Sequence, residues 1–257
     1  MELKVNFTPT DIEAVRHVVV EYGRRVFVRK RIERNVEGSP PLPTQEKVWL
    51  TMAMCLLTTQ QRSDPKSAIS RFLFQKPFPL SLSACQSEPD LEGFVQVKIK
   101  EFGGIRFGPR IAAMMKRNLN TLNSGGWDQL GKHLLGLAEQ RKQRPEPDHY
   151  RLERQAAHAL IGTYGGFGPK QSRNFWQELG LTRYEFVLDS RVNKWLRQMQ
   201  FPIPLTPMSL GEEEFYCFLS DILRDLCVKA GVLPCVLDAA IFASYDTSEW
   251  PEDAAVW

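Results

Sequence analysis

A glycine-rich turn, closed by a proline and a lysine, constrains the fold of this chain more than any other feature. The letters GGFGPK occupy positions 165 to 170. Glycine accepts backbone angles that other residues avoid, and proline suits the first position of a helix because the N–H that it lacks would have no partner there. The pattern predicts a hairpin over 164–170 that opens a helix. The free N–H groups at the start of that helix would form a phosphate site.

Lys170 falls in the first turn of this expected helix. The positive end of the helix dipole disfavours a charged ammonium, and any desolvation acts in the same direction, so we expect a neutral amine that can attack carbon. Asp189 follows 19 positions later (189 − 170). Apolar residues at 192, 195, 196 and 199 then indicate a helix that Asp189 caps. A capping carboxylate stays ionised and can face a developing positive charge.

At these positions the chain resembles the helix-hairpin-helix DNA glycosylases, and within them the bifunctional 8-oxoguanine glycosylase/lyases. The family hairpin has the form Gly-x-Gly-x-Lys, which residues 166–170 reproduce, and the family aspartate follows at about the spacing of Asp189. The resemblance implies that Lys170 attacks the anomeric carbon of the sugar, and that Asp189 assists departure of the base. It also implies that Gly166 and Gly168 lie against the DNA backbone. The alternative is a scaffold hairpin with an ordinary surface lysine.

A polar turn after the apolar segment 48–57 resembles the intercalation loop of the same family. It reads TTQQRS from position 58 to 63. The resemblance implies that Gln60 fills the gap left by the extruded nucleotide, with Gln61 beside it at the DNA. A wedge of this kind offsets part of the free energy needed to flip a base. The alternative is a plain connector between two helices.

The segment 233–245 is expected to form a helix that contributes to the base pocket. Asp238 and Phe242 are four positions apart and share one face of that helix. In 8-oxoguanine glycosylases a polar residue and an aromatic at this spacing hydrogen-bond and stack on the base. A carboxylate suits the N1–H and N2–H₂ edge of guanine. Asp238 could instead pair with an arginine, and Phe242 could belong to the core.

Asn174 is expected to complete the base pocket, four positions after Lys170. Some members of the family have at this position a cysteine or an aromatic residue that sandwiches the base. The asparagine departs from that pattern, and this departure weakens the case for 8-oxoguanine in particular.

Charge and composition describe an ordinary globular chain. The 257 residues carry 33 Lys and Arg against 30 Asp and Glu, a net charge of +3, so affinity for DNA must come from a local patch. The densest run of cations could bind phosphates or form a solvated helix face. It comprises Arg24, Arg25, Arg29, Lys30, Arg31 and Arg34.

The cysteines and histidines give no metal-binding pattern. Three of the five cysteines lie near the C-terminus, at spacings that match neither a zinc knuckle nor the four-cysteine iron–sulfur cluster of some glycosylases. We therefore expect no metal and no cofactor. An odd number of cysteines without secretory features indicates free thiols in a reducing compartment, and no segment has the length and apolarity of a membrane span.

Hydrophobic residues recur at helical spacing along most of the chain, and alternation with period two is nearly absent, so we expect an all-α fold. The first helix should begin near residue 11 with Thr10 as its cap, and Asp64 should cap another helix. Expected helices cover about 45–58, 65–75, 89–101, 108–121 and 127–142, and a later amphipathic helix ends at Gly231.

The resemblance implies a single unit, residues 1–257, built of two helical lobes with the active site in the cleft between them. Lobe A would cover about 45–145 and contain the wedge loop, residues 58–64. Lobe B would cover about 1–44 plus 146–257 and contain both the hairpin and the helix of the base pocket.

Together these features lead us to expect a base excision repair glycosylase with β-elimination lyase activity that removes an oxidised purine, first of all 8-oxoguanine. Its partner would be damaged double-stranded DNA, bound by a monomer inside the cell: in the cytoplasm or nucleoid of a prokaryote, or in the nucleus of a eukaryote. Two alternatives stay open: a related glycosylase for an oxidised pyrimidine or a modified cytosine, and a DNA-binding module without catalysis.

Overall fold

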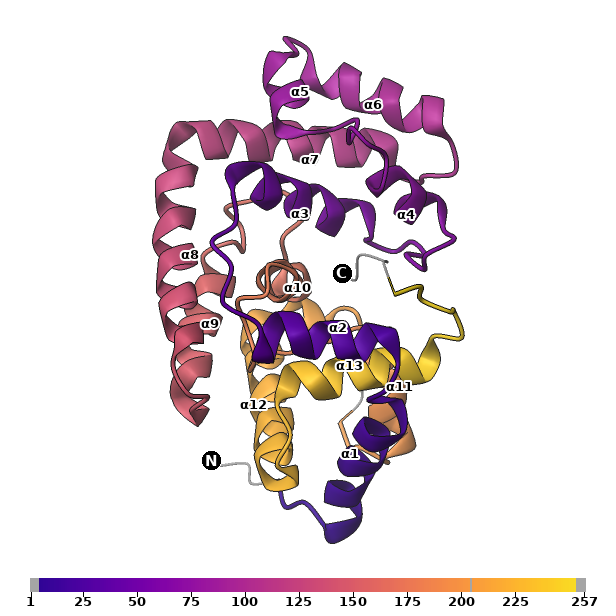
Figure 1. Ribbon diagram of the computed structural model, residues 1–257, viewed down its shortest axis with the longest axis vertical. Coiled ribbons are helices and arrows are strands. Elements are labelled where there is room, and N and C mark those ends of the chain that lie inside the picture. The colour runs from indigo at the N-terminus through magenta and orange to yellow at the C-terminus, as the bar shows by residue number, and fades with distance from the viewer. Residues whose placement is uncertain (1–4, 204, 253–257) are drawn as a thin grey trace.

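The computed structural model describes residues 5–203 and 205–252, and within these ranges it contains helices but no strand (Figure 1). The predicted all-α class is confirmed. The α-helices are α1 (Pro9–Tyr22), α2 (Val26–Ile32), α3 (Gln45–Leu57), α4 (Ala68–Leu73), α5 (Leu82–Ser87), α6 (Leu91–Phe102), α7 (Gly108–Thr121), α8 (Trp127–Lys142), α9 (Tyr150–His158), α10 (Pro169–Glu178), α11 (Ser190–Gln198), α12 (Glu213–Ala230) and α13 (Pro234–Tyr245). A π-helical turn, Glu33–Glu37, extends α2, and another, Leu122–Gly126, joins α7 to α8.

The longer helices begin and end close to the predicted positions, but two predicted caps are wrong. Helix α1 is capped by Thr8, whose backbone N–H donates to the Asp11 carboxylate at 2.7 Å, so the capping box lies two residues before Thr10. Helix α4 is capped by Ser67. Asp64 instead accepts from the backbone N–H of Lys66 at 3.1 Å, within a turn that precedes the helix.

Buried apolar side chains form two large clusters. The first joins residues of α3 to α10, and the second joins residues of α1, α11, α12 and α13. A smaller cluster, which includes Phe27 and Trp250, ties α2 and α13 to the segment after α13. In Figure 1, α10 lies near the middle of the molecule, with α3 above it and α2 and α13 below. The lobe limits given above remain a prediction. Helices α9 and α10, which the prediction places in lobe B, contribute buried side chains to the first cluster together with the helices of lobe A.

The basic run between positions 24 and 34 is divided between the surface and the interior. Arg31 is 2% exposed and bonds to Glu178 at 3.1 Å. Arg34 pairs with the same carboxylate at 2.9 Å. The run is therefore neither a continuous phosphate-binding surface nor a solvated helix face, because Arg31 and Arg34 anchor α2 and the following turn to α10.

No helix in the described part of the chain is both long and apolar enough to cross a membrane by itself. Helices α12 and α13 meet that criterion only as a pair, and the pair is bent by 97° at the break between them.

Candidate active site

The predicted hairpin lies between α9 and α10 and is held by α3 and α7. The Asn118 side chain on α7 accepts from the backbone N–H of Gly165 at 2.6 Å and donates to its carbonyl at 3.1 Å. Gly166 has a φ of +84°, and a Cβ at this position would overlap Leu56 and lie 3.0 Å from the sulfur of Met114. The glycine is therefore required both by the backbone angle and by the space available.

The end of the hairpin leaves the start of α10 open. Gly168 is the N-cap residue; it is exposed, and no side chain caps the helix there. The first N–H groups of an α-helix have no partner inside the helix and carry its positive dipole end. The hairpin thus presents an uncapped helix terminus that can receive an anion such as a DNA phosphate.

Lys170 occupies the second position of α10 and is partly buried. It forms no ion pair with any acidic residue among those that the structure describes. The Cys55 thiol on α3 is one of its neighbours. Burial raises the pKa of that thiol well above its ordinary value, and the nearby Lys170 charge and Asn174 amide oppose the rise. The amine therefore lies at the junction of α3 and α10 and is not tied to a surface carboxylate.

Asp189 caps α11, as predicted. Its Oδ1 accepts from the backbone N–H groups of Arg191 at 2.8 Å and of Val192 at 3.1 Å. Its Oδ2 accepts from Nη1 of the Arg191 side chain at 2.9 Å. The carboxylate side chain keeps 18% of its surface exposed. Three donors therefore fix this anion while one side of it stays accessible.

Asp238 lies on α13 in a buried polar cluster. Its Oδ2 is 3.5 Å from Nη1 of Arg31. Burial raises its pKa to about 7; the Arg31 charge opposes this rise, and the charge of Asp189 adds to it. The two aspartates predicted for catalysis and for the base pocket thus lie close enough to influence each other. The pairing with an arginine, which the sequence left open for Asp238, is present as well.

Phe242 is covered on both faces. Its ring stacks on Phe27 with the centroids 4.1 Å apart and an interplanar angle of 11°. On α11, the Arg191 guanidinium carbon lies 4.2 Å from the ring centroid. A flipped base could reach a face of this ring only after a neighbour moves, so the stacking role remains a prediction.

Asn174 lies on the same face of α10 as Lys170, one helical turn further on. Its Nδ2 is 3.6 Å from the Cys55 sulfur and 3.3 Å from Oε1 of Gln171. Gln177 follows on this face and accepts from Arg31, which in turn bonds to Asp238. One face of α10 thus connects the predicted nucleophile to the predicted base pocket.

The wedge loop follows α3. Gln60 is exposed and has a left-handed φ of +57°, and its carbonyl accepts from the Arg106 side chain. Gln61 is held more firmly, because its Oε1 accepts from the backbone N–H of Arg106 at 2.7 Å and its Nε2 donates to the carbonyl of Leu57 at 3.0 Å. The structure therefore presents Gln60 outward, while Gln61 fastens the loop.

A cavity of about 910 Å³ opens beside the wedge loop. It is bounded by Gln61, Arg62 and residues 64–69, by Gly104 and Arg106, and on the other side by Thr247–Glu249 of the segment after α13. None of the residues predicted for catalysis or for the base pocket lines this cavity. Gln61, which was predicted to contact DNA, does line it.

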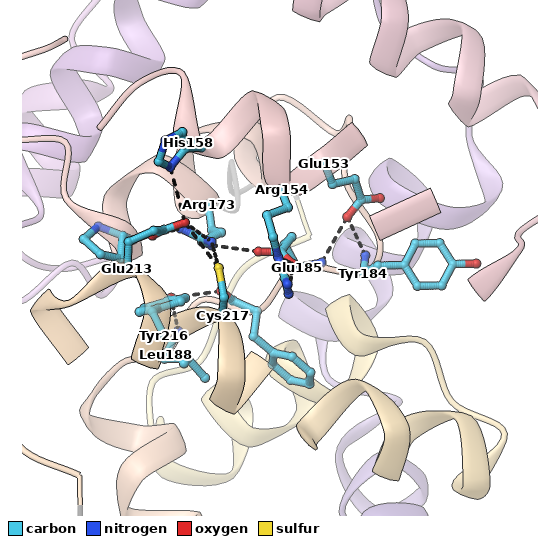
Figure 2. Close-up of polar contacts among 12 residues, drawn as sticks. Glu153, Arg154, His158, Arg173, Tyr184, Glu185, Leu188, Glu213, Tyr216 and Cys217 are labelled. Carbon is cyan, nitrogen blue, oxygen red and sulfur yellow. Dashed lines mark hydrogen bonds and ion pairs between the residues drawn. The ribbon is translucent and has the colours of Figure 1, made fainter. Parts of the chain in front are cut away.

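A buried charge network behind the site holds α10 and the residues before Asp189 in place (Figure 2). Arg173 on α10 bonds to Glu185 at 2.8 Å and to Glu213 on α12 at 2.7 Å. The Tyr216 hydroxyl donates to the carbonyl of residue 186 at 2.9 Å and accepts from the backbone N–H of Leu188 at 2.7 Å. Both predicted catalytic residues thus lie next to segments that this network anchors.

Sequence reasoning missed several residues that shape this site. Arg31 is hidden in a run of cations, and its partners Glu178 and Asp238 are more than 140 positions away along the chain. Arg191 falls in the helix predicted after Asp189, but no role was predicted for it. Gln171 could have been noticed in the sequence, because it is a large polar side chain on the buried side of an amphipathic helix. Among the described residues, no group of three or more His, Cys, Asp or Glu side chains has a metal-binding arrangement.

Comparison with solved structures identifies the fold. Over 96% of this chain and 100% of the other, it matches the 8-oxoguanine DNA glycosylase of Methanocaldococcus jannaschii, with a TM-score of 0.66 and 15% identity. The M. jannaschii 8-oxoguanine glycosylase/lyase bound to a 15mer DNA containing 8-oxoguanine matches at 0.63 and 15%, over 91% of this chain and 98% of that one. The 8-oxoguanine DNA glycosylase of Thermotoga maritima matches at 0.63 and 17%, over 93% and 97%. No protein-family model matches the chain, and no curated protein gives a significant sequence match. The chain therefore has the helical fold of these glycosylases.

Proposed function

We propose that this chain, which has the fold of 8-oxoguanine DNA glycosylases, is a base excision DNA glycosylase with β-elimination lyase activity. The observation that carries the proposal is the placement of Lys170. The amine follows an uncapped helix terminus and forms no ion pair with a described acid, while Asp189 is fixed by two backbone N–H groups at the start of the next helix. An anion site, a nucleophile and a carboxylate are the parts that this chemistry requires.

In the proposed reaction the hairpin receives a backbone phosphate and the damaged nucleotide leaves the stack. The Lys170 nitrogen attacks C1′, and the bond between C1′ and the base breaks as the base takes up a proton. Asp189 stabilises the positive charge that develops on the sugar. The sugar ring then opens as the C1′–O4′ bond breaks and O4′ takes up a proton, which leaves a Schiff base between Lys170 and C1′. Loss of a C2′ proton from this Schiff base expels the 3′ phosphate and nicks the strand.

The substrate that we propose first is 8-oxoguanine. Asp238 can accept two hydrogen bonds from the N1–H and N2–H₂ edge of guanine, which adenine, thymine and uracil do not offer as a pair. The neighbouring Arg31 favours the ionised form that such acceptance needs. The asparagine at position 174 favours a different lesion, because some 8-oxoguanine glycosylases have at this position a cysteine or an aromatic residue that sandwiches the base.

A panel of damaged duplexes tests the proposal. The protein should release 8-oxoguanine placed opposite cytosine and leave a nicked strand. Release from thymine glycol alone would assign the chain to a different lesion within the same fold. Binding to every duplex with no base release would identify a DNA-binding module without catalysis.

A further inference from the structure

The side-chain amide of Gln171 joins the end of α3 to the beginning of α10. Its Nε2 donates to the carbonyl of Cys55 at 2.7 Å and to the Thr59 hydroxyl at 2.6 Å. Its Oε1 accepts from the Asn174 amide at 3.3 Å. The residue is only 6% exposed, so these bonds form away from competing water.

The position of this amide in the chain matters more than its burial. Gln171 directly follows the predicted nucleophile, Lys170, and Thr59 directly precedes the predicted wedge, Gln60. The Thr59 hydroxyl also donates to the Cys55 carbonyl at 2.8 Å, so it is a donor to α3 and an acceptor from α10 at the same time. One continuous set of hydrogen bonds therefore connects the residues next to the wedge and next to the amine.

The far side of the loop is fixed independently. Gln61 bonds in both directions to the backbone of Arg106, at 2.7 and 3.2 Å. Gln60 lies between these two attachments, exposed and with a left-handed backbone. The loop is therefore anchored at both ends while its central side chain projects.

We propose that Gln171 is a positioning residue that couples the wedge Gln60 to the nucleophile Lys170; this rests on the proposed glycosylase function. The wedge enters the duplex at the nucleotide that the amine must attack, so their separation has to be constant. Misplacement of a reacting group by about 1 Å can lower a rate on the order of 100-fold. The amide bridge sets this separation through Thr59, without touching the substrate.

Three variants test the coupling. Gln171→Met keeps the length of the side chain but loses its hydrogen bonds. Thr59→Val keeps the shape of the threonine but loses the hydroxyl, and Thr59→Ser keeps the hydroxyl as the matched control. Each variant is compared with the wild type in single-turnover excision from an 8-oxoguanine duplex. Each is also compared in borohydride trapping on a single-stranded oligonucleotide with an abasic site, which needs the amine but no wedge.

The coupling predicts a tenfold or greater loss of duplex excision for Gln171→Met and for Thr59→Val, with single-strand trapping within twofold of wild type. Thr59→Ser should behave as the wild type. A double variant that combines Gln171→Met with Thr59→Val should excise no more than twofold more slowly than the poorer of the two single variants, because both changes break the same bridge.

Three results would overturn the coupling: unchanged duplex excision in Gln171→Met, fully additive losses in the double variant, or an equal loss of single-strand trapping, which would make the residue merely structural. If instead the wild-type protein traps no abasic DNA, the proposed function itself is wrong. The trapping measurement thus distinguishes failure of the coupling from failure of the proposed function. Thermal unfolding of each variant checks that the variant is folded.

Discussion

The Arg191 guanidinium carbon lies 4.2 Å from the ring centroid of Phe242, on a ring that Phe27 already covers from the other side. The same guanidinium bonds to the Asp189 carboxylate at 2.9 Å. One side chain therefore covers the face predicted to stack on the flipped base and also occupies an oxygen of the predicted catalytic carboxylate. One prediction about the site follows directly from this arrangement.

Arg191→Ala should leave excision of 8-oxoguanine equal to the wild-type rate or raise it by about two- to fivefold. The change uncovers Phe242 and removes a cation–π contact worth roughly 0.5–1 kcal/mol that base entry would have to break. Asp189 keeps both backbone donors, so its position should not change. Single-turnover excision under saturating protein measures the effect. A tenfold loss would mean that the guanidinium itself serves the bound base.

Excision of a lesion with a guanine edge should increase as the pH rises through about 7. Burial raises the pKa of Asp238 from 3.8 to about 7, so below that pH the carboxyl is protonated and cannot accept both hydrogen bonds. The folded state holds this proton more tightly than the unfolded state. The contribution of Asp238 to stability is therefore complete below pH 3.8 and is lost as the pH rises towards 7.

Asp238→Asn isolates this titration. The variant should lose about 10- to 100-fold in excision, as expected for a charged hydrogen-bond partner worth about 1.5–3 kcal/mol. The excision rate of this variant should not show the increase near pH 7 that is expected for the wild type. Trapping at a preformed abasic site, where there is no base to read, should be unchanged. A pH profile of excision identical to that of the wild type would exclude Asp238 as the residue that reads the base.

Gly166→Ala should destabilise the protein by about 2–5 kcal/mol, because a side chain at a left-handed φ is strained and the added methyl overlaps Leu56. Gly168→Ala is the matched control, since its Cβ would meet nothing within 4 Å. That variant should stay within about 0.5 kcal/mol of wild type. Urea denaturation of both proteins measures the difference. Equal stabilities would contradict the packing described for the hairpin.

Helical periodicity predicted the longer helices well, because three or more turns give a repeated apolar pattern. The bounds of α7 and α8 agree with the expected 108–121 and 127–142. Helices α2 and α5 were not predicted, since seven and six residues contain too few repeats to reveal a period. The two wrong caps arose where several residues able to cap a helix occur close together, and only the backbone decides which one does so.

The local parts of the candidate site could be read from the sequence, and the long-range parts could not. The glycine hairpin and the Asp189 cap depend on neighbours within a few positions. The Arg31–Asp238 pair and the bridge from Gln171 to Thr59 join residues that are 207 (238 − 31) and 112 (171 − 59) positions apart. No periodicity encodes such contacts, because packing of separate helices creates them.

Borohydride trapping on an 8-oxoguanine duplex tests the central claim most directly. The wild-type protein and Lys132→Ala, which removes an exposed lysine from α8, should both give a covalent protein–DNA adduct. Lys170→Ala should give none, even though it still binds the duplex. An adduct of undiminished yield from Lys170→Ala, or none from the wild type, would contradict the assignment of Lys170 as the nucleophile.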